Sequence, residues 1–202
     1  MKGKGWYLKN HPLLLIMDTH TLPTSIEIDG IEYTFDADYR NIIYIFTALN
    51  DPDLLDAEKV MVALNLFYDD FESIPKNKLE YAAKEMFAFM NMGEEHTSVK
   101  HNAKPLYDWE QDFNIIVAPI NRILNTDVRG LQFLHWWTFL SAFYEIGECT
   151  FSTFVNIRNK LNKGKKLEKY EQTLYNENKE RIVLKKKYDT VTQDLMNEIL
   201  GV

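Results

Sequence analysis

The sequence is poor in the residues that build disulfide, metal and phosphate sites. Cys149 is its only cysteine, which rules out an internal disulfide and is typical of an intracellular protein. The eight glycines are scattered, and the chain contains no phosphate-binding loop, zinc-protease motif, CxxC pair or nucleophile elbow. We therefore expect a protein that is not an enzyme, has no catalytic residues and takes no cofactor.

The sequence gives little support for a metal site or a nucleic-acid-binding site. His96 and His101 lie near Glu94 and Glu95, but a spacing of five does not place two histidines on one helical face, so we expect no metal site. The lysines near the C-terminus are interspersed with glutamates and come without a helix-turn-helix or RNA-binding motif. Nucleic-acid binding through this Lys-rich end stays an alternative.

No apolar run is long enough to cross a membrane. The apolar part of residues 131–147 spans about 14 residues, whereas a bilayer core requires about 20. Residues 13–17 form an apolar run that is too short for a signal peptide. We interpret residues 1–16 as an N-terminal extension, with Met17 favoured over Met1 as the start.

The chain does contain enough apolar residues for a core. Of its 202 residues, 46% are hydrophobic, which is enough for one moderate domain with appendages. Its charge is uneven, because residues 153–202 carry a net charge of +4 and the rest carry −11, giving the total of −7. Solvated helix surfaces explain this pattern, and head-to-tail self-association or an acidic partner would also fit it.

The residues after position 24 predict a β-hairpin followed by helices. Asp29-Gly30 interrupts an alternating apolar pattern, as in a hairpin with a type I′ turn. Asp36 or Asp38 can cap the next helix. Two helical stripes follow, formed by Ile42, Ile45, Phe46 and Leu49 and then by Val60, Leu64, Phe67 and Tyr68.

Two further helices are predicted on either side of a polar linker at about residues 93–105. Asn77 and Glu80 have the spacing of a capping box, and Gly93 is well placed to end the helix that follows. The other helix resumes after Tyr107, with Pro119 expected to kink or end it near Val117.

The fold is therefore predicted to be mainly α, with a small N-terminal β-hairpin. We expect an extension over residues 1–16, a β-hairpin plus helical domain over 17–162 and a charged C-terminal segment of one or two long helices over 163–202. A near-heptad stripe in that segment is a candidate partner-binding surface. It consists of Leu184, Tyr188, Val191, Leu195 and Ile199.

The run LQFLHWWTFLSAFYEIG, residues 131–147, predicts an amphipathic helix. Its apolar side chains fall within a band about 120° wide and should be buried. They are Phe133, Trp136, Trp137, Leu140, Phe143 and Tyr144. The opposite face should hold His135, Thr138, Ser141, Ala142 and Glu145. We expect His135 to be a surface residue or an interhelical hydrogen-bonding group.

This run and its neighbours resemble the bacteriophage gene product 15 family. The resemblance lies in Asp127-Val128, in the LHWWxF element at Leu134–Phe139 and in Ile157-Arg158, with further similarity upstream, and it covers about residues 25–188. The family usually has a cysteine before the glycine at the position of Gly93 and lacks a proline at the position of Pro119.

The resemblance implies a phage tail assembly chaperone in the host bacterial cytoplasm. Such a chaperone would bind the tape measure protein and tail tube subunits, and it could form a homo-oligomer. Helix-in-groove recognition by repeated copies would suit this role. The alternatives are a nucleic-acid-binding or host-directed regulatory protein and a structural component of the finished tail.

Overall fold

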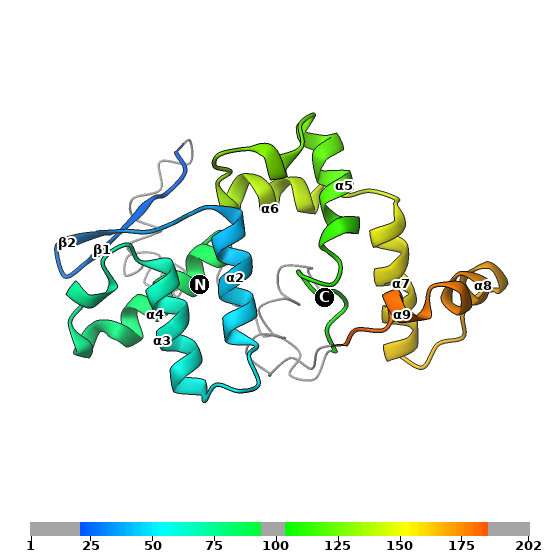
Figure 1. Ribbon diagram of the computed structural model, residues 1–202, viewed down its shortest axis with the longest axis horizontal. Coiled ribbons are helices and arrows are strands. Elements are labelled where there is room, and N and C mark those ends of the chain that lie inside the picture. Colours follow the sequence, from blue (N-terminus) through cyan, green and yellow to red (C-terminus); the bar gives the residue numbers. More distant parts are fainter. Residues whose placement is uncertain (1–20, 94–103, 186–202) are drawn as a thin grey trace, which may run out of the picture. The chain divides into compact units, whose positions relative to one another are not determined.

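The computed structural model describes residues 21–93 and 104–185, and these are mainly helical with a two-stranded antiparallel sheet, as predicted (Figure 1). The chain divides into two compact units. Unit 1 comprises Met1–Thr97 with Phe133–Trp137, and unit 2 comprises Ser98–Gln132 with Thr138–Val202. The predicted extension, the start at Met17 and most of the predicted linker, including His96 and His101, lie outside the described residues.

Unit 1 opens with the predicted hairpin, formed by β1 (Ser25–Ile28) and β2 (Ile31–Thr34). Asp29 has a φ of 53° and Gly30 a φ of 80°, the two positive values that a type I′ turn requires. Ile26 and Ile28 are buried on one side of the hairpin. The Asp-Gly pattern thus predicted the turn and the hairpin.

Replacing Gly30 by alanine should destabilise this hairpin by about 1 kcal/mol, because a Cβ is strained at positive φ. A Cβ at this position would meet no atom within 4 Å, so the effect isolates backbone strain from steric clash. The matched control is Gly147→Ala, which also meets no atom and is not at positive φ. Urea unfolding should separate the two variants, and equal midpoints would contradict the assignment.

Helices α2 (Tyr39–Leu49) and α3 (Asp56–Phe67) pack side by side in unit 1 (Figure 1). Asp38 caps α2, since its carboxylate accepts a hydrogen bond from the Arg40 N–H at 2.9 Å. The predicted apolar stripe of α2 is buried, and so are three of the four predicted positions on the second stripe, namely Leu64, Phe67 and Tyr68.

Helix α4 (Leu79–Met90) begins differently from the prediction. Two short 3-10 turns precede it, η1 (Phe71–Ser73) and η2 (Lys76–Lys78), and η2 runs directly into the helix. Lys78 is therefore the capping residue, so the predicted capping box of Asn77 and Glu80 is wrong. The prediction at the other end holds, because Gly93 has a φ of 76° and its N–H bonds the Ala88 carbonyl at 2.7 Å.

Helix α5 (Phe113–Leu124) of unit 2 begins later and ends later than predicted. Before it, the side chains of Asp108 and Asp112 accept hydrogen bonds from nearby backbone N–H groups, which makes a turn where the sequence indicated a first helical turn. Of the two effects expected of Pro119, the end near Val117 is wrong, since α5 continues to Leu124, and the kink stays a prediction. The burial of its apolar face offsets the hydrogen bond that proline removes.

The remaining elements of unit 2 are η3 (Val128–Gly130), most of α6 (Trp136–Tyr144), α7 (Thr150–Asn162), α8 (Lys169–Glu177) and α9 (Lys179–Ile182). The first part of the charged C-terminal segment is not a long helix. Gly164 has a φ of 64° and caps α7, and residues 165–168 are irregular before α8 begins. No helix in the described part of the chain is long and apolar enough to cross a bilayer.

Candidate functional site

The two adjacent tryptophans join α6 to the end of α4 within unit 1. The indole N–H of Trp136 donates to the Met90 carbonyl and that of Trp137 to the Phe89 carbonyl, both at 2.8 Å. These carbonyls belong to the last turn of α4, where helical partners run out. Both tryptophans are buried, so this motif is a structural anchor rather than a surface for ligands.

The backbone before α6 pairs with the start of α2. The Tyr39 N–H donates to the Leu134 carbonyl at 3.0 Å, and the Trp136 N–H donates to the Ala37 carbonyl at 2.7 Å. The Asp38 carboxylate also accepts from the Leu134 N–H at 3.0 Å. Burial raises the pKa of Asp38, but hydrogen bonds from Arg40 and from the Leu134 N–H outweigh it and hold that pKa below its usual value.

His135 is buried and hydrogen-bonded, so the prediction of a surface position is wrong, and its hydrogen bonds are made to the residues before β1 and to the start of its own helix rather than to another helix. Its Nδ1 accepts from the Trp137 N–H at 3.1 Å, which caps the start of α6, and its Nε2 lies 2.9 Å from the Pro23 carbonyl oxygen. Because Nδ1 accepts, the proton resides on Nε2 and is donated to Pro23. The neutral ring thus ties α6 to the residues before β1.

Acidification should therefore weaken unit 1 through His135. Burial lowers the pKa of His135 below 6.5, and the hydrogen bond to Pro23 only partly opposes this shift. The unfolded chain then binds a proton at His135 more readily than the folded chain does. The contribution of His135 to stability is therefore constant above a pH of about 6.5 and falls as the pH drops below it. Thermal unfolding measured from pH 7.5 to 5.5 should show the loss.

The control for this titration is His135→Asn. Asparagine is a good N-cap whose oxygen can accept from the Trp137 N–H, but it carries no proton that titrates in this range. The variant should lose less of its melting temperature between pH 7.5 and 5.5 than the parent protein. An identical pH dependence in both proteins would show that His135 does not cause it.

The helical wheel predicted only part of the burial around α6. Trp136, Trp137, Leu140 and Phe143 are buried as expected, but Phe133 and Tyr144 are about half exposed. Phe133 precedes the helix, which begins at Trp136, so the wheel does not apply to it. Ala142, placed on the polar face, is buried as well.

A buried ion pair holds unit 2 together at Arg158 of α7. Its guanidinium makes two hydrogen bonds to the Asp112 carboxylate, at 2.6 and 3.0 Å, and both side chains are at most 5% exposed. It also donates to the carbonyls of Leu106, Arg181 and Ile182, at 3.0, 2.9 and 2.6 Å. One side chain therefore joins α7, the turn before α5 and the end of α9.

Gln111 fixes the same C-terminal stretch from a second side. Its amide nitrogen donates to the carbonyls of Arg181 and Val183, at 3.0 and 2.9 Å, and its amide oxygen accepts from the Lys185 N–H at 3.1 Å. Residues 181–185 are thus held by side chains about 70 positions earlier in the chain. These contacts fix the position of the last described residues of the chain.

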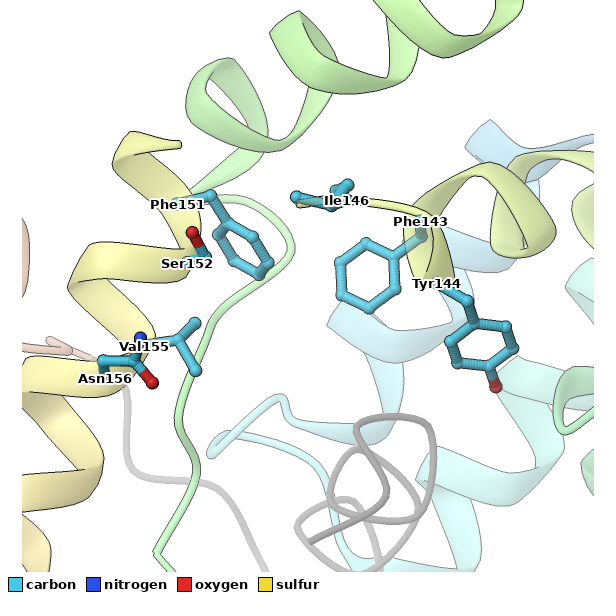
Figure 2. A pocket seen from close by; sticks show the side chains of 7 residues that line it. All are labelled: Phe143, Tyr144, Ile146, Phe151, Ser152, Val155 and Asn156. Atoms are coloured by element: carbon cyan, nitrogen blue, oxygen red, sulfur yellow. The ribbon is translucent and has the colours of Figure 1, made fainter. Parts of the chain in front are cut away.

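Unit 2 also contains a small pocket, lined by both aromatic and polar side chains, between the end of α6 and the first half of α7 (Figure 2). Its volume is about 190 Å³. Figure 2 shows Phe143 of α6 and Phe151 of α7 facing each other, and their ring centroids lie 5.5 Å apart, so the two rings contact each other at one side of the pocket. The lining consists of Phe143, Tyr144, Ile146, Phe151, Ser152, Val155 and Asn156.

The predicted partner-binding stripe is described at one position only. Leu184 lies in the irregular stretch after α9 and is half-buried, so it does not continue a helix there. The other four positions, Tyr188, Val191, Leu195 and Ile199, lie outside the described residues. Within residues 21–93 and 104–185, no three His, Cys, Asp or Glu side chains gather closely enough to hold a metal ion.

Sequence reasoning missed both the Arg158 ion pair and the pocket. Ile157-Arg158 was identified only through the family resemblance. Nothing in the sequence near Arg158 indicates that its partner is Asp112, 46 positions away. The pocket likewise depends on the turn between α6 and α7, and residues 145–149 gave no prediction of it.

Comparison with known proteins identifies the family of this chain. The family model described as "Bacteriophage Gp15 protein" matches residues 19–184. The match includes the tryptophan anchor, Asp112 and Arg158, together with the hairpin. No curated protein and no solved structure matches the chain. Because the family model covers most of the sequence, the chain belongs to the bacteriophage Gp15 protein family.

Proposed function

We propose that this phage protein is a non-enzymatic tail assembly chaperone that binds the tape measure protein and tail tube subunits in the host cytoplasm. The family match over residues 19–184 is the observation that carries the proposal, since it places the chain among phage proteins. The residues singled out above act in packing and helix capping rather than around a reacting group, which suits a protein that works by binding.

Helix α3 offers a surface suited to a helical partner. Leu55 directly precedes the helix and is 72% exposed, and Val62, seven residues later, is 38% exposed. Val62 and the half-buried Leu66 are four residues apart and lie on one face of α3, and Leu55 stands at the N-terminal end of the helix. An exposed apolar strip of this kind fits helix-in-groove recognition of a long helical protein such as a tape measure.

Co-expression with the tape measure protein of the same phage tests the proposal. The chaperone should keep the tape measure protein in the soluble fraction, and the double variant Leu55→Lys with Val62→Lys should reduce that soluble fraction several-fold. The matched control is Ala57→Lys with Met61→Lys, because these exposed positions lie on the other side of α3. A tape measure protein that aggregates equally with and without a folded chaperone would refute the role.

Two further measurements separate the alternative functions. Mass spectrometry of purified virions should not detect the protein, because a chaperone leaves the assembled tail, whereas a structural tail component would be present. Retention on nucleic acid at about 50 mM salt, lost as salt rises, would instead favour the nucleic-acid-binding alternative.

A further inference from the structure

The pocket of unit 2 has the size of a side-chain binding site. At about 190 Å³ it is smaller than the roughly 300–1,000 Å³ of pockets that hold small-molecule ligands. Phe143 and Phe151 make its buried walls, Val155 is half-buried beside them and Tyr144 is 47% exposed at its edge. Such a pocket has room for one or two side chains from a peptide segment, with aromatic rings at some of its lining positions and the polar groups of Ser152 and Asn156 at others.

We propose that residues 186–202 of the same chain dock on this pocket and insert apolar side chains between α6 and α7. These residues lie outside the described part of the chain, and their sequence provides the stripe Tyr188, Val191, Leu195 and Ile199. The docked segment would cover Val155 and the exposed edge of Tyr144. This inference does not depend on the proposed chaperone function.

The position of the described residues that precede the segment supports this occupant. Arg158 holds the carbonyls of Arg181 and Ile182, and Val155 of the pocket lies three residues before Arg158 on the same helix. One helical turn rises 5.4 Å, so the chain emerges close to a wall of the pocket. Tyr188 follows Lys185 by three positions, a length of chain that can span roughly 10 Å, which is enough to bring the stripe to the pocket.

Charge at the two surfaces is complementary where they would first meet. The segment is introduced by three lysines, at positions 185–187. The pocket is flanked by Glu145 and Glu148, which are both exposed, and the sequence has no lysine or arginine between positions 130 and 157. Opposite charges at the approach would orient the segment before its apolar side chains dock.

Docking within one chain is favoured over docking on a second copy. A short covalent connection can give the segment an effective concentration of roughly the millimolar range at its own pocket. A second copy in a micromolar solution would have to compete with that. The pocket and the segment's point of attachment both lie in unit 2, so one chain provides the whole interaction.

Disulfide trapping in the full-length chain tests this inference. In a Cys149→Ser background, Val155→Cys is combined with one stripe substitution, Val191→Cys, Leu195→Cys or Ile199→Cys, and oxidation is followed on non-reducing gels. At least one pair should form a monomeric disulfide about tenfold faster than the control pair made with Gln193→Cys, which lies off the stripe. Equal rates for stripe and control pairs, or a predominantly dimeric product, would overturn docking within the chain.

Hydrogen exchange provides a second, independent readout. Amides in residues 188–199 should be protected in the parent protein and should lose that protection in Val155→Asp, because a carboxylate in the pocket opposes apolar side chains. The control is Leu161→Asp, which places the same charge at an exposed site farther along α7. Protection that is absent from the parent, or unchanged in Val155→Asp, would contradict the proposal even where the disulfide variants fail to fold.

Discussion

Replacing Arg158 by methionine should lower the free energy of unfolding of unit 2 by about 3–5 kcal/mol. The substitution leaves the Asp112 carboxylate, which is 1% exposed, without its charged partner. It also removes the donors for the carbonyls of Leu106, Arg181 and Ile182. Buried polar groups without partners are costly, so the loss should exceed that of an ordinary surface ion pair.

Urea unfolding followed by hydrogen exchange would locate this effect. Amides of α7 and α9 should exchange faster in Arg158→Met, while those of α2 in unit 1 should change little. The matched control is Arg129→Met, because Arg129 pairs with Asp127 in the same bidentate manner but both side chains are more than half exposed. Its unfolding midpoint should stay close to that of the parent, and an equal loss in both variants would contradict the role given to burial.

Arg158→Lys is the more specific test, because it keeps the positive charge and removes only the planar arrangement of the guanidinium donors. A lysine ammonium has three donors at one point, whereas the guanidinium of Arg158 donates five hydrogen bonds in several directions. The variant should therefore recover only part of the lost stability. Full recovery would mean that charge alone matters and that the carbonyls find other partners.

Local sequence patterns predicted the features of this fold that local physics determines. The Asp29-Gly30 turn needs two positive φ angles, and few residue pairs other than this one adopt them readily. Asp38 was one of two candidates for the cap of α2, and the buried stripe of that helix follows directly from its period. In each of these cases the deciding interactions lie within a few residues.

Features that depend on distant partners were predicted incorrectly or not at all. His135 lies on the polar side of the wheel, yet Pro23, 112 positions earlier, gives it a buried hydrogen-bond partner. Pro119 would end many helices, but the burial of its neighbours in unit 2 carries α5 past it. The candidate stripe at the C-terminus could be predicted from the spacing of its apolar residues. The pocket in which we propose that it docks forms only when α6 and α7 are folded.

Replacing Trp136 by alanine should cost unit 1 about 3–5 kcal/mol, because the side chain is fully buried. The cost has two parts. The indole fills space beside Phe46, with ring centroids 6.2 Å apart, and its N–H satisfies the Met90 carbonyl at the end of α4. Alanine removes both contributions and leaves a cavity where a large side chain stood.

Trp136→Phe separates the two contributions, since it keeps an aromatic ring and removes the donor to Met90. Its cost should be smaller, about 1–3 kcal/mol, and should reflect the carbonyl left without that hydrogen bond together with the smaller ring. The control is Phe133→Ala, in the same motif but 52% exposed, which should change stability by less than about 1 kcal/mol. If Trp136→Ala instead kept its unfolding midpoint and lost tape measure binding, Trp136 would be a partner contact and the LHWW motif would belong to the binding surface rather than to the core.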